Sequence, residues 1–407
     1  MYQIGFFIYV GIFRLVALFH TKANKMVQGH KETWVLLSKS IDQKKPWLWF
    51  HASSLGEFEQ GRPVMERIRA KHPEYKILLT FYSPSGFEVR KNYSGADLIC
   101  YLPFDTLWNV KRFLRLVQPK MAFFIKYEFW PNYLHELRKK EIPAYLISGI
   151  FRPDQLFFKK YGFFYRGLLE SFNHIFVQNK ESQKLLKSIG RKKDVSITGD
   201  TRYDRVLEIK SASKKLPLIA KFCSGEKRIL IAGSSWPKDE ELLLPYFNEH
   251  SDLKLLIAPH EINEGHLLDI ESKLTRPSVR YSLATPEELA SCDCLILDCF
   301  GLLSSAYRYA DMAYIGGGFG AGIHNTLEAA VYNIPLLFGP NYSKFQEAKE
   351  LIQNGGGYSI DSYESMSNHL NTWIQDDEVR KNTGKIAGEM VKNGSGGSKI
   401  VLMTLPL

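Results

Sequence analysis

The regular alternation of short apolar runs with longer amphipathic stretches is the feature of this 407-residue chain that most constrains its fold. The apolar runs predict buried strands, and the stretches between them predict helices. The predicted strands are residues 47–50, 76–80, 98–101, 121–125, 144–147, 175–177, 195–197, 228–232, 254–258, 294–297, 312–315 and 335–338. Because such alternation produces βαβ units, the predicted fold class is α/β, with parallel sheets covered by helices on both faces.

The alternation is interrupted once, over residues 210–226, where the sequence KSASKKLPLIAKFCSGE is polar and lacks clear periodicity. We therefore predict a linker at 210–226 that joins two doubly wound, Rossmann-like lobes, over residues 21–209 and 227–407. The chain is long enough for each lobe to have its own core. Because such sheets bind ligands beyond the carboxyl ends of their strands, we expect a cleft between the lobes.

The N-terminal segment Tyr2–Phe19 is apolar except for Gln3 and Arg14. Its length is close to the roughly 20 residues that a bilayer span needs. It lacks the basic region and the small-residue cleavage site of a signal peptide, so we expect it to be retained. Residues 1–20 are therefore predicted to be a membrane anchor.

Lys22, Lys25 and Lys31 follow this segment and, by the positive-inside rule, would keep the downstream chain cytoplasmic. Arg14 would be costly at the centre of a bilayer. A span and an interfacial helix both remain open, and so does an ordinary amphipathic helix packed on the protein.

The net charge of +10 permits an anionic partner. The basic residues are scattered along the chain, however, and no zinc finger or RNA-binding signature accompanies them. We therefore expect no nucleic-acid partner and favour an anionic membrane surface.

Three loops of the second half follow predicted strands and precede predicted helices: AGSSWPKDEE (232–241), APHEINEGH (258–266) and the glycine-rich loop GGGFGAGIHNT (316–326). Backbone N–H groups at helix N-termini suit a phosphate. Three such loops in one lobe favour a nucleotide, since phosphate, ribose and base each need a binding loop. The glycines would let the backbone approach that ligand without an intervening Cβ. Asn325 and Glu328 have the spacing of a capping box, a geometry that can also hold a ribose hydroxyl.

Two glutamates lie in turns that follow predicted strands of the first half. Glu57, in HASSLGEFEQGRP, starts a helix beside Gly56 and could act as a general base on a sugar hydroxyl. Taken alone, the pattern favours a first-turn glutamate that complements the helix dipole. Glu128, in KYEFWPN, precedes Pro131 and is open to the same two interpretations.

Together these motifs resemble the 3-deoxy-D-manno-octulosonic acid (Kdo) transferases. The resemblance covers nearly the whole chain and is carried by SLGE, EFWPN, GDTRYD, GSSWPKDEE, DCFGLL, GGGFGAGIHNTLEAA and PLLFGP. It implies a two-lobed GT-B fold and an inverting transfer of Kdo from CMP-Kdo to lipid IVA, in the lipopolysaccharide biosynthesis of Gram-negative bacteria. It also implies an enzyme of the inner membrane, with its lobes on the cytoplasmic side, that uses no cofactor and no metal ion.

The resemblance further implies roles for single residues. Glu57 would be the general base, and Ser54, Gly56 and Glu128 would lie on the acceptor side. The implied donor-binding residues are Ser234, Ser235, Pro259, His260, Phe300, Gly301, Gly317, Gly318, Asn325 and Glu328.

Two positions depart from the family pattern. Pro259-His260-Glu261 stands where Pro-Arg-His is usual, and Asp200 stands where asparagine is usual. His260 or Arg202 would then supply the charge of the missing arginine. Because Glu57 and the glycine-rich loop are present, these changes suggest a divergent branch rather than loss of function.

Two other classes of function stay open. A UDP-sugar transferase or a nucleotide-sugar epimerase would explain the lobes and the glycine-rich loop, but not the apolar N-terminus or EFWPN. A non-catalytic, nucleotide-binding membrane scaffold would have had no reason to keep Glu57.

Overall fold

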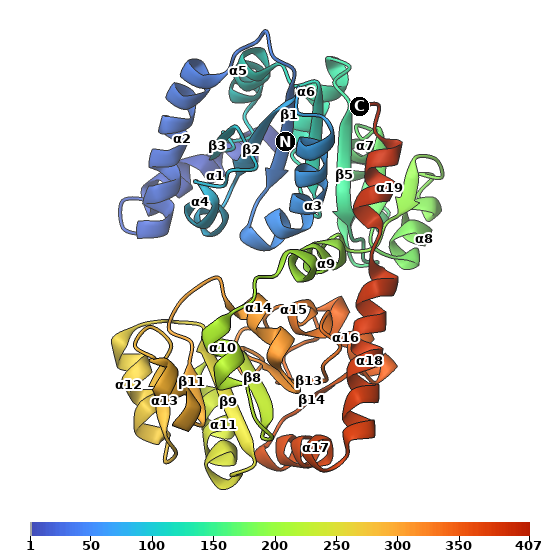
Figure 1. Cartoon of the computed structure of the whole chain (residues 1–407). Coiled ribbons are helices and arrows are strands. Elements are labelled where there is room, and N and C mark those ends of the chain that lie inside the picture. Colours follow the sequence, from blue (N-terminus) through green and yellow to red (C-terminus); the bar gives the residue numbers. More distant parts are fainter. Residues whose placement is uncertain (1) are drawn as a thin grey trace. The chain divides into compact units, whose positions relative to one another are not determined.

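The structure is a computed structural model that describes residues 2–407. The chain packs as two compact units: unit 1 is Met1–Arg205 with Ser395–Leu407, and unit 2 is Val206–Gly394. Met1, part of the predicted anchor, lies outside the described residues. Each unit contains one seven-stranded parallel sheet, which confirms the predicted α/β class with two doubly wound lobes (Figure 1).

The sheet of unit 1 has the strand order β3-β2-β1-β4-β5-β6-β7. Its strands are β1 (Trp47–Ala52), β2 (Lys76–Phe81), β3 (Leu98–Tyr101), β4 (Met121–Ile125), β5 (Ala144–Gly149), β6 (His174–Val177) and β7 (Val195–Ile197). Its helices are α1 (Tyr2–Val16), α2 (Thr21–Ser40), α3 (Leu55–Lys71), α4 (Pro84–Arg90), α5 (Leu107–Val117), α6 (Pro131–Lys139), η1 (Leu156–Phe158), α7 (Phe163–Leu169), α8 (Lys180–Ser188) and α19 (Gly397–Thr404).

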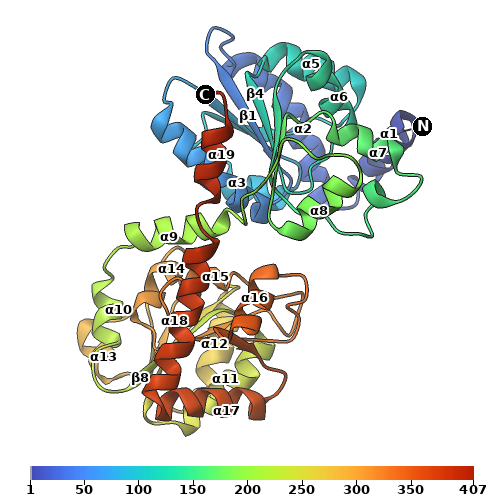
Figure 2. The ribbon, with the colours of Figure 1, turned by 90° about the vertical axis from the view of Figure 1, so that its right-hand side faces the viewer.

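Every residue of β1 and β4 is buried, because helices cover both faces of the sheet. On one face, α5 and α6 pack through residues such as Phe113 and Tyr133. On the other face, α3 and α19 pack through residues such as Val64 and Val401, and α19 lies beside α3 in both views (Figures 1 and 2). The strands therefore read as continuous apolar runs in the sequence.

The sheet of unit 2 has the order β10-β11-β9-β8-β12-β13-β14. Its strands are β8 (Arg228–Ser235), β9 (Leu253–Pro259), β10 (Ser278–Arg280), β11 (Cys294–Ile296), β12 (Met312–Ile315), β13 (Leu336–Phe338) and β14 (Gly357–Ser359). Helix α9 (Arg202–Ala212) begins in unit 1, and the rest are α10 (Pro217–Phe222), α11 (Pro237–Glu249), α12 (Glu264–Lys273), α13 (Pro286–Ser291), α14 (Leu303–Ala306), η2 (Tyr307–Tyr309), α15 (Leu327–Ala330), α16 (Gln346–Asn354), α17 (Tyr363–Gln375) and α18 (Asp377–Gly394).

The boundaries between the units differ from those predicted. The predicted linker 210–226 contains helix α10, whose Ile219 and Phe222 are fully buried in unit 2. The last residues return to unit 1, where the Asp204 carboxylate accepts hydrogen bonds from the backbone N–H of Gly396 (2.6 Å) and Ser398 (2.7 Å). The sequence pattern did not predict this return, because a contact between positions so far apart in the chain produces no periodicity in the sequence.

The N-terminal apolar segment forms helix α1, which ends at Val16, and a turn leads from it to α2. The Tyr2 hydroxyl donates to Asp105 (2.7 Å), and the Phe6 ring packs edge-on against Trp130. Among the helices of residues 2–407, none combines the length and the apolar character needed to cross a bilayer.

Candidate active site

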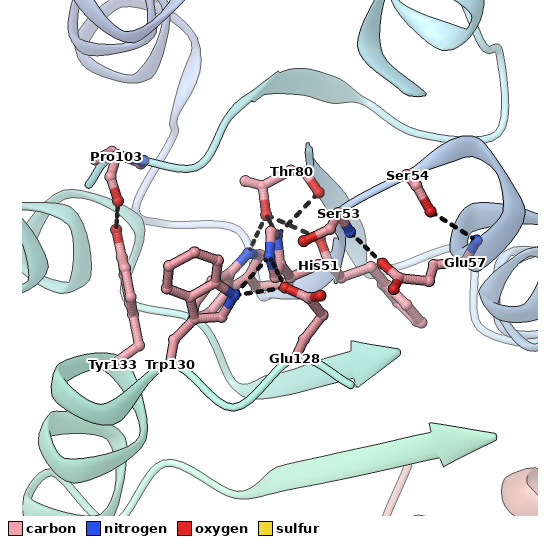
Figure 3. A network of polar contacts seen from close by, with 11 residues as sticks. His51, Ser53, Ser54, Glu57, Thr80, Pro103, Glu128, Trp130 and Tyr133 are labelled. Carbon is pink, nitrogen blue, oxygen red and sulfur yellow. Dashed lines mark hydrogen bonds and ion pairs between the residues drawn. The ribbon is translucent and has the colours of Figure 1, made fainter. Parts of the chain in front are cut away.

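The two glutamates singled out in the first half lie at the switch point of the unit 1 sheet. Strands β1 and β4 are neighbours there, and their connections leave in opposite directions along the sheet. Glu57 lies in the first turn of α3, just after β1, and Glu128 lies just after β4. Both side chains belong to one polar network (Figure 3).

Glu57 is half-buried, and its carboxylate accepts a hydrogen bond from the Ser53 backbone N–H (2.6 Å). Burial, followed by the negative charge of Glu128, raises the pKa of Glu57 to about 7. The hydrogen bond from Ser53 and the charge of Lys126 oppose this shift. A carboxyl group with this pKa can exchange a proton at neutral pH.

Glu128 is buried, yet the pKa of its carboxyl group is lowered, because hydrogen bonds to the charged form outweigh desolvation. His51 Nε2 lies 3.0 Å from the Glu128 carboxylate, and the Trp130 indole N–H donates to it at 2.6 Å. The hydroxyl of Ser53 also stabilises the charged form. Glu128 is therefore held as a carboxylate.

His51 is fully buried and is held by the neighbouring strand. Its Nδ1 lies 3.1 Å from the Thr80 carbonyl oxygen and 2.9 Å from the Thr80 hydroxyl. That hydroxyl donates to the carbonyl of Phe50 (3.3 Å) and accepts from the Trp49 indole (2.8 Å), so it faces Nδ1 as an acceptor. The Nδ1 atom therefore carries a proton, and the Nε2 atom, which lies beside the Glu128 carboxylate, must carry a second proton when His51 donates to that carboxylate.

The network thus holds two carboxyl groups whose pKa values are shifted in opposite directions. This is the arrangement by which one site can keep a permanent negative charge beside a group that gains and loses a proton. Ser54 has a simpler local role, because its hydroxyl caps α3 by accepting from the Glu57 N–H (3.4 Å). Gly56 is exposed and has open space where a Cβ would stand.

In unit 2 the predicted donor-binding loops follow four strands that lie side by side, β11, β9, β8 and β12. Pro259 is the last residue of β9. Phe300 and Gly301 follow β11, and both are exposed. Ser234 is half-buried with a φ of +54°. Ser235, in contrast, is fully buried and its hydroxyl donates to Glu240 (2.8 Å), so its side chain is not available to a phosphate as predicted.

The glycine-rich loop is shaped mainly by contacts inside unit 2. A Cβ on Gly318 would lie 2.5 Å from the Gly339 backbone, and the Gly317 N–H donates to the Asp239 carboxylate (2.8 Å). Gly317 has a φ of +90°, and its Cβ would lie 2.6 Å from the carbonyl oxygen of Gly322. These two glycines are therefore required by the packing of the loop, before any ligand is considered.

Three aromatic side chains stack beside this loop. The rings of Trp236 and His260 lie 4.7 Å apart, and those of His260 and His324 lie 4.4 Å apart. The Trp236 indole donates to His324 Nε2 (3.1 Å), and burial together with His260 lowers the pKa of His324 to about 4. His260 is exposed at the carboxyl edge of the sheet. The sequence alone did not identify Trp236 and His324 as the rings that stack against it.

Asn325 and Glu328 interact, but not as the predicted capping box. The Asn325 side-chain oxygen accepts from the Leu327 N–H (3.2 Å), and its amide donates to the Glu328 carboxylate (3.0 Å). The following helix α15 has only four residues. The sequence fits a capping box because a capping box and the observed contact both place an amide and a carboxylate three residues apart.

Arg202 was one candidate for the charge missing from the donor side. Its guanidinium forms an ion pair with Asp200 (2.7 Å), the residue that departs from the family pattern, and Gln60 also donates to Asp200 (2.8 Å). Both members of that pair are in unit 1. Among residues 2–407, no cluster of three or more His, Cys, Asp and Glu side chains is arranged to hold a metal ion.

His51 and Trp130 are two of the network members that the sequence alone did not identify. Both stand inside motifs that were singled out, His51 directly before ASSLGE and Trp130 within EFWPN. Their spacing from Glu57 and Glu128 gives no sign of contact, since His51 and Glu128 are 77 positions apart. The available signal was a histidine next to the carboxyl end of an otherwise apolar strand.

Comparisons with known proteins agree with the motifs. Residues 28–205 match the family described as 3-deoxy-D-manno-octulosonic-acid transferase (kdotransferase). The 3-deoxy-D-manno-octulosonic acid transferase of Aquifex aeolicus is 27% identical over 329 residues, covering 79% of this chain and 84% of that protein. The protein of the same name from Chlamydophila psittaci is 28% identical over 333 residues, covering 78% and 75%. The resemblance inferred from the sequence is confirmed.

A solved structure, that of UDP-GlcNAc 2-epimerase from Neisseria meningitidis, superposes with a TM-score of 0.62 at 15% identity. The superposition covers 88% of this chain and 99% of that one. At this identity the likeness shows the fold alone, and it confirms the GT-B type of fold.

Proposed function

We propose that this chain, whose residues 28–205 belong to the Kdo transferase family, is an inverting glycosyltransferase that moves Kdo from CMP-Kdo to a hydroxyl of lipid IVA. The observation that carries the proposal is the carboxyl pair at the switch point of β1 and β4, which lies inside the matched segment. The Glu57 carboxylate takes the proton of the acceptor hydroxyl while that oxygen bonds to the anomeric carbon of Kdo. The bond from this carbon to the phosphate oxygen breaks, and CMP leaves.

Glu128 supports this step without touching the transferred proton. Its fixed negative charge raises the pKa of Glu57, so that Glu57 is a stronger base than an exposed glutamate. His51 and Trp130 keep Glu128 ionised and fix its position. His51 and Trp130 are thus positioning residues.

The donor is assigned to unit 2 because the predicted donor-binding loops follow four neighbouring strands there. His260 stands at the position of the missing arginine, and it is exposed and stacked between two other rings. The backbone of Ser234, the turn at Phe300 and the side chains of Asn325 and Glu328 are the remaining proposed contacts.

A transfer assay with CMP-Kdo and lipid IVA, read by mass spectrometry, tests the whole proposal. The expected product carries added Kdo and appears together with CMP. The alternative of a UDP-sugar transferase or epimerase is tested by thermal shift with CMP and with UDP. A ligand present at 100 times its Kd adds about 2.7 kcal/mol to the free energy of unfolding. A shift with UDP but not with CMP would replace the proposed donor.

We also propose that α1 attaches the protein to the cytoplasmic face of the inner membrane. Its solvent-facing side carries large apolar side chains, among them Ile8 (59% exposed) and Leu15 (64% exposed). Replacing both by glutamine should shift the protein from the membrane fraction to the soluble fraction. Val89→Gln is the matched control, because Val89 is equally exposed (57%) on α4. Equal partitioning of the double variant and the control would contradict attachment through α1.

A further inference from the structure

A cavity of about 470 Å³ lies in unit 1 where α1 and α2 meet the loop between β3 and α5. Its lining combines cationic and aromatic side chains with no acidic one. The lining residues are Arg14, Val27, His30, Lys31, Trp34, Pro103, Phe104, Trp108 and Asn109. Of these, Figure 3 shows only Pro103, whose carbonyl accepts from the Tyr133 hydroxyl (3.0 Å). None of them has a role in the proposed transfer reaction, which therefore does not account for this cavity.

His30 is the most informative member of the lining. Its side chain is only 6% exposed and stacks on Phe104, with ring centres 4.1 Å apart. Both of its ring nitrogens are buried without a hydrogen-bond partner among the described residues. Burial, with the charge of Arg14, lowers the pKa of His30 to about 3, so the ring is neutral and presents one donor and one acceptor. Buried polar groups are seldom left unpaired, so a ligand in the cavity that accepts a hydrogen bond would satisfy the donor nitrogen of His30.

The cations around His30 indicate the charge of that ligand. Arg14 and Lys31 are exposed, and no carboxylate of residues 2–407 lies within ion-pair distance of either. Arg112 lies over the Trp34 ring at 4.3 Å and over the Trp108 ring at 5.4 Å, which adds a third positive charge at the rim. An anion with several acceptor oxygens, such as a phosphate, fits this set of donors.

The surroundings of the cavity indicate what carries the phosphate. Arg14 projects from α1, the helix whose exposed side carries large apolar residues such as Ile12 (57% exposed). Trp108 is 67% exposed at the rim, and indole rings favour the boundary between lipid and water. Phosphate and apolar surface side by side match an amphiphile better than a free ion.

We propose that this cavity binds the phosphate group of an anionic membrane phospholipid, whose acyl chains lie along the exposed side of α1. The His30 N–H and the guanidinium of Arg14 donate to the phosphate oxygens, and Lys31 contributes charge. The inference rests on the proposed membrane attachment, which it deepens by naming the lipid group that is recognised.

The test uses full-length protein and dihexanoylphosphatidylglycerol below its micelle concentration, so that binding is measured without a membrane. Titration should move the side-chain ¹⁵N resonances of His30. His30→Phe keeps the ring that stacks on Phe104, and it should weaken binding about tenfold, as expected for the loss of one hydrogen bond to a charged group. Arg14→Gln should do the same, and because Arg14 is exposed this variant carries the test if His30→Phe does not fold.

Lys25→Gln is the matched control, because it removes one exposed charge of α2 outside the cavity and should leave affinity unchanged. Equal losses for Lys25→Gln and Arg14→Gln would overturn the site in favour of general attraction. Equal affinity and equal ¹⁵N shifts with inorganic phosphate alone would overturn the assignment to a lipid. If the parent binds phosphatidylglycerol vesicles while the short-chain lipid leaves His30 unmoved, attachment stands and the cavity proposal fails.

Discussion

The carboxyl edge of the unit 1 sheet ends in side chains that ionise, whereas the same edge of unit 2 ends in tight backbone turns and stacked rings. In unit 1, burial and the charge of Glu128 raise the pKa of Glu57, whereas hydrogen bonds to its charged form lower the pKa of Glu128. In unit 2, Gly317 and Gly318 pack against neighbouring backbone, and His260 stacks between two rings. One topology thus places two carboxyl groups of opposite pKa shift at the edge of one sheet, and packed glycines with stacked rings at the same edge of the other.

This contrast predicts that substitutions at the two edges affect different properties of the enzyme. Loss of an ionisable group in unit 1 should change rate and pH dependence while ligand affinity holds. A misplaced backbone in unit 2 should change affinity while the pH dependence holds. The substitutions below test this separation.

The largest effect is expected for Glu57→Gln, which keeps the size of the side chain and removes its basicity. The kcat of Kdo transfer should fall roughly 10²–10⁴-fold, the usual contribution of a general base. CMP affinity and the melting temperature should hold. Glu59→Gln is the control on the same helix, since Glu59 pairs with Arg62 and Arg90 outside the network. Equal kcat values for the two variants would remove Glu57 from the mechanism, and Glu128 would become the next candidate.

A smaller effect, confined to affinity, is expected from Gly318→Ala in unit 2. The new Cβ would lie 2.5 Å from the Gly339 backbone, so the two loops must move apart. The Kd for CMP should rise about tenfold, or about 1.4 kcal/mol. Gly320→Ala is the control, because its Cβ would meet only the Gly317 carbonyl oxygen at 3.6 Å. Parental CMP binding by Gly318→Ala would place the donor elsewhere.

Glu128→Gln should move a pH profile. Removing the negative charge beside Glu57 lowers the Glu57 pKa, because that charge disfavours ionisation of its neighbour. Transfer requires ionised Glu57, so the rise of kcat/KM with pH should begin at a lower pH than in the parent. The measurement is kcat/KM against pH for the parent and for Glu128→Gln under the same conditions. A profile unmoved by Glu128→Gln would show that the two carboxyl groups do not interact.

The smallest effect is expected for Ser54→Ala, which removes the side-chain cap of α3. Loss of an N-cap hydroxyl costs about 1 kcal/mol of stability, measurable by denaturant unfolding. If Ser54 acts only as a cap, KM for the acceptor will not change. A large rise in that KM with unchanged stability would instead support the acceptor-side role implied by the family resemblance.

The contrast between the units also explains how far sequence reasoning reached. The apolar runs identified β1–β9 and β11–β13, because strands buried on both faces leave continuous apolar stretches. Strands β10 (Ser-Val-Arg) and β14 (Gly-Tyr-Ser) were missed, since each has three residues with a single large apolar side chain, whereas the equally short edge strand β7 (Val-Ser-Ile) has two. The return of Ser395–Leu407 to unit 1 was missed because it depends on Asp204, nearly two hundred positions earlier.

For the site, motifs located Glu57 and Glu128 but could not give their protonation states. Those states depend on burial and on contacts such as that of His51 with Glu128, which the pairing of β1 with β4 brings together. The glycines of unit 2 were located correctly, but the sequence could not separate glycines that face open space from those that face backbone. The motif alone predicts that Gly317→Val weakens CMP binding and leaves the fold largely intact, but a valine there would meet both a positive φ and the Gly322 carbonyl oxygen.

The pH dependence of kcat/KM for the parent enzyme, with CMP-Kdo and lipid IVA, tests the central claim most directly. Glu57 must be ionised to take the acceptor proton, and its pKa is raised to about 7. The account predicts that kcat/KM is low at pH 5.5, rises through a midpoint near pH 7 and levels off above about pH 8. A profile that is already flat from pH 5.5 upward, as an exposed glutamate would give, would contradict it.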